Sequence, residues 1–211
     1  MPLEIFPYTL GPLENNTYLL VDTVTRQAVI VDPSFESHQI AKKILTEKLH
    51  LTQIWLTHAH FDHIAGAKLY SEFSQPPLPI SLHREDLNLF HEGGGAPMFG
   101  IQMPEMPEPS RFFEHGQQVF VGQELLEVRH TPGHSRGHII LYAPQAAAAL
   151  VGDLIFKHAV GRTDLPGGSS TQLLKSIYTQ VLSLPPETRL LSGHGPETTV
   201  QEEVANNPYL R

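Results

Sequence analysis

Apolar residues first occur along the chain in short runs that are typical of β-strands. The segments 17–22 (TYLLVD) and 27–32 (QAVIVD) are two such runs, and the short TVTR segment between them gives the spacing of a hairpin. Between 36 and 48 the pattern changes, because apolar residues recur on one helical face with charged residues opposite. A strand-like run at 52–57 (TQIWLT) and a helix-like run at 64–73 (IAGAKLYSEF) follow. The first part of the chain therefore predicts strands interleaved with helices.

The second part of the chain repeats this arrangement. Strand-like runs occupy 118–122, 124–131, 138–143, 147–153 and 189–193, and helix-like runs occupy 171–184 and 196–205. Strands followed by helices, twice over, favour two packed sheets with helices outside them. No linker divides the chain, so we expect a single domain over residues 1–211. The stretch 91–111 is rich in Gly, Pro and Met and lacks periodicity, which is typical of a functional wall or lid.

Composition narrows the classes of partner and of chemistry. The chain has 211 residues, with 14 Lys and Arg against 22 Asp and Glu, a formal net charge of −8. This balance argues against nucleic acid or an anionic membrane as the main partner. No secretory signal and no apolar run long enough for a membrane span is visible, so a cytoplasmic protein is expected. Because there is no cysteine, metal chemistry must use histidine and carboxylate ligands. Nothing indicates the oligomeric state.

The segment 56–66, LTHAHFDHIAG, crowds four metal-binding side chains into six positions. If the strand at its start continues, His58 and His60 point the same way and can bind one ion. Asp62 and His63 follow where the chain turns into a helix, and helical neighbours point about 100° apart, since a turn holds ~3.6 residues. These two side chains do not easily join the same ion. The economical solution is two neighbouring ions.

Three downstream residues are suited to complete the two sites. His134, Asp153 and His194 each follow a strand-like run and lie beside glycine, which lets the backbone approach an ion closely. Each ion needs about three or four protein ligands if a position is to stay open for water. An aspartate is the natural bridge, because its two oxygens can each bind one cation.

The set His58-x-His60-x-Asp62-His63, followed by His134, Asp153 and His194, resembles the metallo-β-lactamase superfamily. The resemblance covers nearly the whole chain and implies an α/β fold, an αββα four-layer sandwich with the metal site at the strand ends. It implies a first metal on His58, His60 and His134, a second metal on Asp62, His63 and His194, a bridge at Asp153, and a carboxylate at Asp32 that orients a ligand histidine from outside.

Two close divalent ions lower the pKa of a shared water, so that a hydroxide is present near neutral pH to attack a polarised carbonyl. Zinc is the first expectation for both ions, with iron or manganese as alternatives. Asp62 is the expected catalytic residue, because it can bind metal and accept a hydrogen bond from the hydroxide. A thiolate, of parent pKa ~8.5, leaves without a proton donor, which favours a small-molecule thioester substrate.

The segment 158–170, HAVGRTDLPGGSS, looks most like the glyoxalase II group, which hydrolyses S-(2-hydroxyacyl)glutathione. In that group a basic residue at the position of Arg162 contacts the thiol carrier. Longer members add a C-terminal helical region, whereas only 195–211 follow the last expected ligand here. The alternatives are a mononuclear-iron persulfide dioxygenase, which shares the GRTD stretch, and a lactone or β-lactam hydrolase. A non-enzymatic metal-binding scaffold is least favoured. The metal, the acyl group and the carrier are left open.

Overall fold

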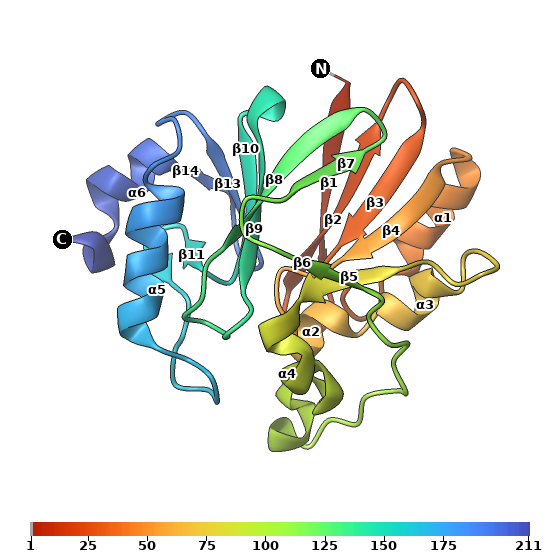
Figure 1. Ribbon diagram of the computed structural model, residues 1–211, viewed down its shortest axis with the longest axis horizontal. Helices are drawn as coiled ribbons and strands as arrows, with labels where there is room; N and C mark the ends of the chain where they lie inside the picture. The colour runs from red at the N-terminus through yellow and green to blue at the C-terminus, as the bar shows by residue number, and fades with distance from the viewer. Residues whose placement is uncertain (1) are drawn as a thin grey trace.

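The computed structural model describes residues 2–211, and its main strands form two six-stranded sheets (Figure 1). The first sheet has the strand order β1-β2-β3-β4-β5-β6, with the strands Leu3–Leu10 (β1), Asn15–Asp22 (β2), Gln27–Val31 (β3), His50–Trp55 (β4), Ile80–His83 (β5) and Arg111–Phe113 (β6). The second has the order β14-β13-β10-β9-β8-β7, with the strands Gln118–Val121 (β7), Glu124–His130 (β8), Ile139–Ala143 (β9), Ala148–Gly152 (β10), Arg189–Ser192 (β13) and Thr198–Thr199 (β14). A separate hairpin consists of Ile155–Phe156 (β11) and Ala159–Val160 (β12).

Helices lie on the outer side of each sheet. The α-helices are His38–Thr46 (α1), Phe61–Ile64 (α2), Ala67–Ser71 (α3), Leu87–His91 (α4), Ser170–Ser176 (α5) and Val200–Asn206 (α6). Figure 1 shows α1 and α3 beside the first sheet and α5 and α6 beside the second. The predicted αββα sandwich is therefore confirmed. No helix within residues 2–211 is long and apolar enough to cross a membrane.

Strands with apolar residues on both faces produce the layered arrangement. In β2 and β3, Leu19 and Ile30 face α1, where they pack with Ile40, while Leu20 and Val29 face the second sheet. All five are completely buried. Successive side chains of a strand point to opposite faces, so an uninterrupted apolar run supplies both layers. Each such side chain contributes about 1.5–3 kcal/mol by leaving water.

The bounds predicted for the helix at 64–73 are wrong. This segment forms parts of two short helices, α2 and α3, and α2 already begins at Phe61. The interruption is at Gly66, whose N–H donates to the carbonyl of Pro33 (2.8 Å). A Cβ on Gly66 would lie 2.7 Å from the carbonyl oxygen of Ser34, so a larger residue would not fit this close approach. The earlier start places the acidic and basic side chains of the 56–66 motif on the first turn of a helix.

Candidate metal centre

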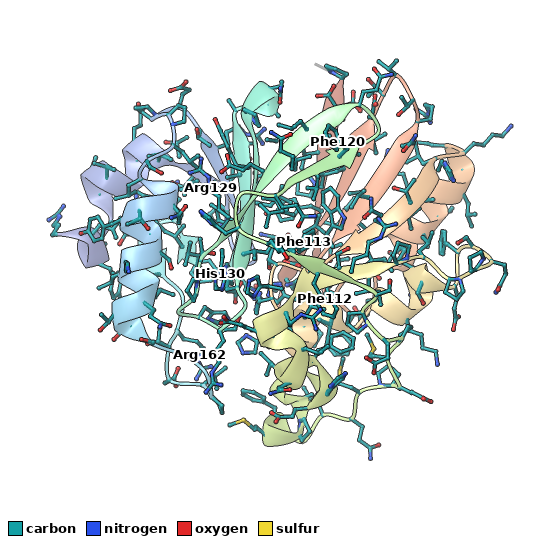
Figure 2. All side chains as sticks on the ribbon, in the orientation of Figure 1. Phe112, Phe113, Phe120, Arg129, His130 and Arg162 are labelled. Atoms are coloured by element: carbon teal, nitrogen blue, oxygen red, sulfur yellow. The ribbon has the colours of Figure 1, made fainter. Side chains whose placement is uncertain are left out.

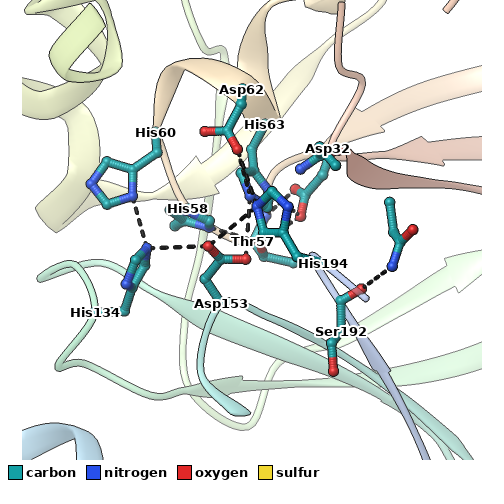
Figure 3. Close-up of polar contacts among 12 residues, drawn as sticks. Asp32, Thr57, His58, His60, Asp62, His63, His134, Asp153, Ser192 and His194 are labelled. Carbon is teal, nitrogen blue, oxygen red and sulfur yellow. Dashed lines mark hydrogen bonds and ion pairs between the residues drawn. The ribbon is translucent and has the colours of Figure 1, made fainter. Parts of the chain in front are cut away.

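All seven predicted ligands converge at one edge of the sandwich, where strands of both sheets end (Figure 3). β10 ends directly before Asp153 and β13 ends two residues before His194. These two strands are parallel, and after a register shift Gly152 pairs with Ser192, so their ends bring both ligands to the same place. β4 ends at Trp55, earlier than predicted, so His58 and His60 are aimed by an extended loop rather than by strand alternation.

The first candidate group is His58, His60 and His134, whose ligand atoms lie within 4.8 Å of one another. Nδ1 of His60 and Nε2 of His134 are 2.8 Å apart. Nδ1 of His134 donates to the carbonyl of Arg162 (2.9 Å), which leaves the lone pair on Nε2. Nε2 of His58 is buried. The histidine nitrogens of this group thus converge on one point.

The second candidate group is Asp62, His63 and His194, again within 4.8 Å. Nδ1 of His63 donates to Oδ2 of Asp32 (2.9 Å), and Nδ1 of His194 donates to the carbonyl of Leu13 (2.9 Å). Both histidines therefore direct the Nε2 lone pair inward. Nε2 of His194 lies 3.2 Å from Oδ2 of Asp62. A lone pair facing a carboxylate is favourable only when a cation lies between them.

Asp153 lies between the two groups. Its Oδ1 is 3.4 Å from Nε2 of His63, and its Oδ2 is 3.7 Å from Nε2 of His134 and 3.6 Å from Nε2 of His194. The adjoining backbone is close, since a Cβ on Gly193 would lie 2.2 Å from Oδ1 of Asp153. One carboxylate therefore faces both groups, as a bridging ligand would.

Burial and neighbouring charges keep His58 and His60 neutral, whereas they favour a cationic His63 beside ionised carboxylates. Burial and then the neighbouring His134 lower the pKa of His60 to about 3. Burial likewise holds the pKa of His58 well below its usual value. Burial also lowers the pKa of His63, but the carboxylates around it outweigh that effect and hold this pKa well above its usual value. Burial raises the pKa of the Asp153 carboxyl, but the neighbouring His63 outweighs that effect and holds this pKa far below its ordinary range. A proton or a metal cation is thus required beside His63.

Three buried atoms test whether the residues fit metal ions. Nε2 of His58, Nε2 of His63 and Oδ1 of Asp153 have no hydrogen-bond partner within the described residues. Leaving a buried polar atom unsatisfied costs about 1–3 kcal/mol, and coordination to a cation would satisfy all three. Nitrogen and oxygen donors without sulfur suit zinc, iron or manganese. The residues present therefore fit a pair of divalent ions.

Asp32 and Thr57 lie directly behind His63. Oδ1 of Asp32 accepts from the backbone N–H of Thr57 (2.7 Å), while its Oδ2 accepts from the Thr57 hydroxyl (2.6 Å) and from His63. The sequence did not point to Thr57, because a threonine is not a typical metal ligand. It also left His138 unassigned, although this residue is fully buried with its ring 5.3 Å from that of His58.

A cavity of about 900 Å3 opens over the site. Five candidate ligands form part of its lining, and large apolar side chains form much of the rest: Leu13, Phe61, Leu89, Met98, Phe99, Ile101, Phe156, Val160 and Leu165. Met98, Phe99 and Ile101 belong to the stretch 91–111, so the expected wall is present. On the rim, Arg162 is exposed at the loop after β12 (Figure 2). Its guanidinium donates two bonds to Asp164, Nε to Oδ1 and Nη2 to Oδ2, both 2.7 Å long.

Sequence comparisons agree with this geometry. The family model of the metallo-β-lactamase superfamily matches residues 10–194. The probable metallo-hydrolase YqgX of Bacillus subtilis (strain 168) is 37% identical over 204 residues, which cover 95% of this chain and 94% of the relative. The hydroxyacylglutathione hydrolase GloC of Haemophilus influenzae is 30% identical over 211 residues, covering 100% of this chain and 98% of the relative.

Solved structures share the whole architecture. The crystal structure of BLEG-1 B3 metallo-β-lactamase superposes with a TM-score of 0.91 at 33% identity, over 98% of this chain and 99% of that one. TTHA1623 in a di-iron-bound form superposes with a TM-score of 0.86 at 40% identity, over 97% of this chain and 100% of that one. The chain belongs to the metallo-β-lactamase superfamily.

Proposed function

We propose that the protein is a metal-dependent thioester hydrolase of the glyoxalase II type, acting on S-(2-hydroxyacyl)glutathione or a related acyl thioester. The observation that carries this proposal is the pair of three-residue ligand groups that share one carboxylate on the floor of a large cavity. Two divalent ions held there supply Lewis acidity and an activated water. The proposed ligands are His58, His60 and His134 for the first ion, Asp62, His63 and His194 for the second, and Asp153 for both.

The surroundings of the site favour an ester with a good leaving group. Phe61 and Phe156 line the cavity beside the ligands, and the ring centroid of Phe156 is 6.2 Å from that of His194. His158 also lines the cavity, but its Nε2 already pairs with Glu202 (2.8 Å). A departing amine needs a proton, whereas a thiolate, of parent pKa ~8.5, does not. Phe61 and Phe156 beside the ligands offer no proton to a leaving group, so this part of the cavity is better suited to a thioester than to an amide.

Asp62 is proposed to orient the nucleophile. Its side chain is buried, and its Oδ2 lies near both His194 (3.2 Å) and His63 (3.6 Å). Burial raises the pKa of this carboxyl, but the neighbouring histidines outweigh it and keep the pKa below its usual value. Asp62 therefore stays ionised at neutral pH and can accept a hydrogen bond that aims the attacking oxygen.

A glutathione-type carrier is supported by the similarity to GloC over the full chain and by the position of Arg162 on the cavity rim. The guanidinium already pairs with Asp164, so a substrate carboxylate must exchange with that side chain. Such an exchange between exposed groups is inexpensive, because exposed ion pairs contribute about 0–1 kcal/mol. Arg162 is thus available to an anionic carrier.

The test is a thioester assay paired with metal analysis. Protein reconstituted with zinc, and separately with iron, should hold about two ions per chain and release free thiol from S-lactoylglutathione without oxygen. A preparation with both ions bound that cleaves no thioester would contradict the proposal. Oxygen uptake with glutathione persulfide by a one-iron form would instead support the dioxygenase alternative.

A β-lactam hydrolase is the second candidate, favoured by the similarity to BLEG-1 over 98% of this chain. Its substrate also presents a carbonyl to the same ions, but the amine leaving group needs a proton. The same reconstituted protein should be tested with a chromogenic cephalosporin. Turnover of the cephalosporin that exceeds turnover of every thioester tested would reverse the order of the two candidates.

A further inference from the structure

Asp86 is a buried carboxylate outside both candidate ligand groups. It ends a 3-10 turn, Arg84–Asp86, that follows β5, and it is 1% exposed. Its Oδ2 accepts from the N–H of Ala59 (3.0 Å) and from the hydroxyl of Ser135 (2.7 Å), and its Oδ1 accepts from the N–H of Gly137 (2.6 Å). Both carboxylate oxygens therefore have strong donors.

These hydrogen bonds reach the two loops that carry the first ligand group. Ala59 lies between His58 and His60, and Ser135 directly follows His134. Ala59 is 27 positions from Asp86 in sequence and Ser135 is 49 positions away on the other side. One side chain thus connects these two segments at the positions next to the ligands, in addition to the backbone hydrogen bond from the N–H of Ile139 to the carbonyl of Thr57 (2.8 Å).

We propose that Asp86 is a positioning residue for the first metal ion: it fixes the loop after β4 relative to the loop after β8, so that the three histidines converge. This inference rests on the metal site of the proposed function, not on its substrate. Hydrogen bonds that orient the ligands of a metal typically account for 10–100-fold in its affinity.

The chemistry of the three contacts requires a carboxylate. All three partners are donors, and an ionised carboxylate only accepts hydrogen bonds, whereas an Asn side chain has one acceptor and one NH2 donor. In Asp86→Asn the NH2 group would face an N–H or an O–H. The close approach of Gly137 to Asp86 requires a glycine, because a Cβ at position 137 would lie only 2.6 Å from the backbone nitrogen of Asp86.

Asp22 provides a matched control at the opposite edge of the sandwich. It is completely buried and accepts from the N–H of Val24 (2.8 Å), the hydroxyl of Thr25 (2.8 Å) and the N–H of Gln123 (2.9 Å). It too connects two separate turns. Because β2 and β3 are antiparallel, Asp22 at the end of β2 lies far from Asp32 and the metal site at the end of β3.

The experiment measures zinc affinity and thermal stability of Asp86→Asn and Asp22→Asn beside the unaltered protein. Metal-free protein is titrated with zinc against a chromophoric chelator, and the Tm of each metal-free form is recorded. Both substitutions should lower the metal-free Tm, because each disrupts a buried carboxylate that accepts three hydrogen bonds or more. Only Asp86→Asn should weaken the first zinc, by tenfold or more.

Zinc affinity of Asp86→Asn within twofold of the unaltered protein, with a Tm lowered as in Asp22→Asn, would overturn the inference. If Asp86→Asn does not fold, the zinc affinity of Ser135→Ala provides the test. This variant removes a single hydrogen bond and keeps the carboxylate. A weakening of twofold or more then supports the role, and unchanged affinity overturns it. Failure of the unaltered protein to bind zinc or iron would refute the proposed function itself, whereas failure to cleave thioesters would leave the role of Asp86 standing.

Discussion

Asp153 is the one side chain that faces both candidate ligand groups, so its removal should affect both ions. Asp153→Asn replaces a ligand oxygen by an amide NH2 that cannot coordinate. We expect less than one ion per chain and nearly complete loss of hydrolysis. Asp62→Asn should also abolish hydrolysis, yet it should retain the first ion, because Asp153 and the three histidine ligands of that ion all remain. Elemental analysis and a thioester assay of both variants test this, and two ions retained by Asp153→Asn would refute the bridge.

Arg162 is expected to govern affinity for the carrier rather than the chemical step. Its contact is made in the ground and transition states alike, so Arg162→Ala should raise KM more than it lowers kcat. A contact between exposed charged groups contributes about 0–1 kcal/mol, which corresponds to an effect of up to about fivefold on a glutathione thioester. A small uncharged thioester should hardly be affected.

Asp164→Asn is the matched control for that variant. It removes the partner of the guanidinium and leaves Arg162 free, so KM for a glutathione thioester should fall. Steady-state kinetics on the charged and the uncharged substrate separate the two effects. Equal losses on both substrates in Arg162→Ala would mean that the arginine supports the loop, and its carrier role would be abandoned.

His83 should titrate at an unusually low pH. It is half-buried and stacked on His130, with ring centroids 3.9 Å apart, and burial followed by that neighbour lowers its pKa to about 4. The unfolded value is ~6.5, so between pH 6.5 and 4 the unfolded state binds more protons. The contribution of His83 to stability is therefore present above that window and is lost as the pH falls through it.

Two measurements check this titration. NMR of the His83 ring should give a midpoint well below pH 6. The unfolding free energy of His83→Gln should also decrease less between pH 7 and pH 4.5 than that of the unaltered protein. A ring that titrates near pH 6.5 would contradict the prediction.

At the scale of elements, the 3-10 stretch Gly93–Phe99 lies against the loop that carries His60. Gly94 and Gly95 both have positive φ, +65° and +77°. A Cβ on Gly94 would lie 2.3 Å from the nitrogen of Phe61 and 2.6 Å from the carbonyl oxygen of Ala59, whereas a Cβ on Gly95 would meet nothing within 4 Å. The cavity wall and the ligand loop are therefore in direct backbone contact only at the first of these glycines.

Comparison of Gly94→Ala with Gly95→Ala isolates this contact. Both variants carry the strain of a positive φ, about 1–2 kcal/mol. Only Gly94→Ala should displace the wall from the ligand loop, so it should lose further stability and reduce kcat/KM for a thioester. Chemical denaturation and steady-state kinetics measure the two effects. Equal behaviour of the variants would show that the wall does not depend on this approach.

Apolar periodicity predicted the elements that are buried on both faces, and it failed where local features compete. β1 was not predicted, because Pro7 interrupts it; the strand accepts proline since it lies at the sheet edge. β5 has only four residues, too few for a period to appear. The break at Gly66 depends on the carbonyl of Pro33, a tertiary contact that no local pattern shows.

At the scale of the whole molecule, the four-layer architecture and the convergence of the seven candidate ligands follow from the sequence. Metal ligands have a recognisable chemistry: four are crowded into the segment 58–63, and Asp153 and His194 follow strand ends beside glycine. The residues that support them have no such signature. The hydrogen bonds of Asp86 and the pairing of Arg162 with Asp164 depend on the packing of loops, which the sequence pattern does not determine.

Metal removal should destabilise the whole sandwich, because ligands from both sheets meet at the site. His58 follows the first sheet, whereas Asp153 and His194 follow strands of the second. An ion present at about 100 times its Kd stabilises the folded state by ~2.7 kcal/mol, and ~1 kcal/mol shifts the Tm of a domain this size by about 2–4 °C. Two ions therefore correspond to a fall of about 10–20 °C on chelation, measured by calorimetry. Asp153→Asn should show a much smaller fall, since it holds little metal to lose. A Tm that stays constant after verified removal of both ions would mean that the ligands are held by the packed loops alone.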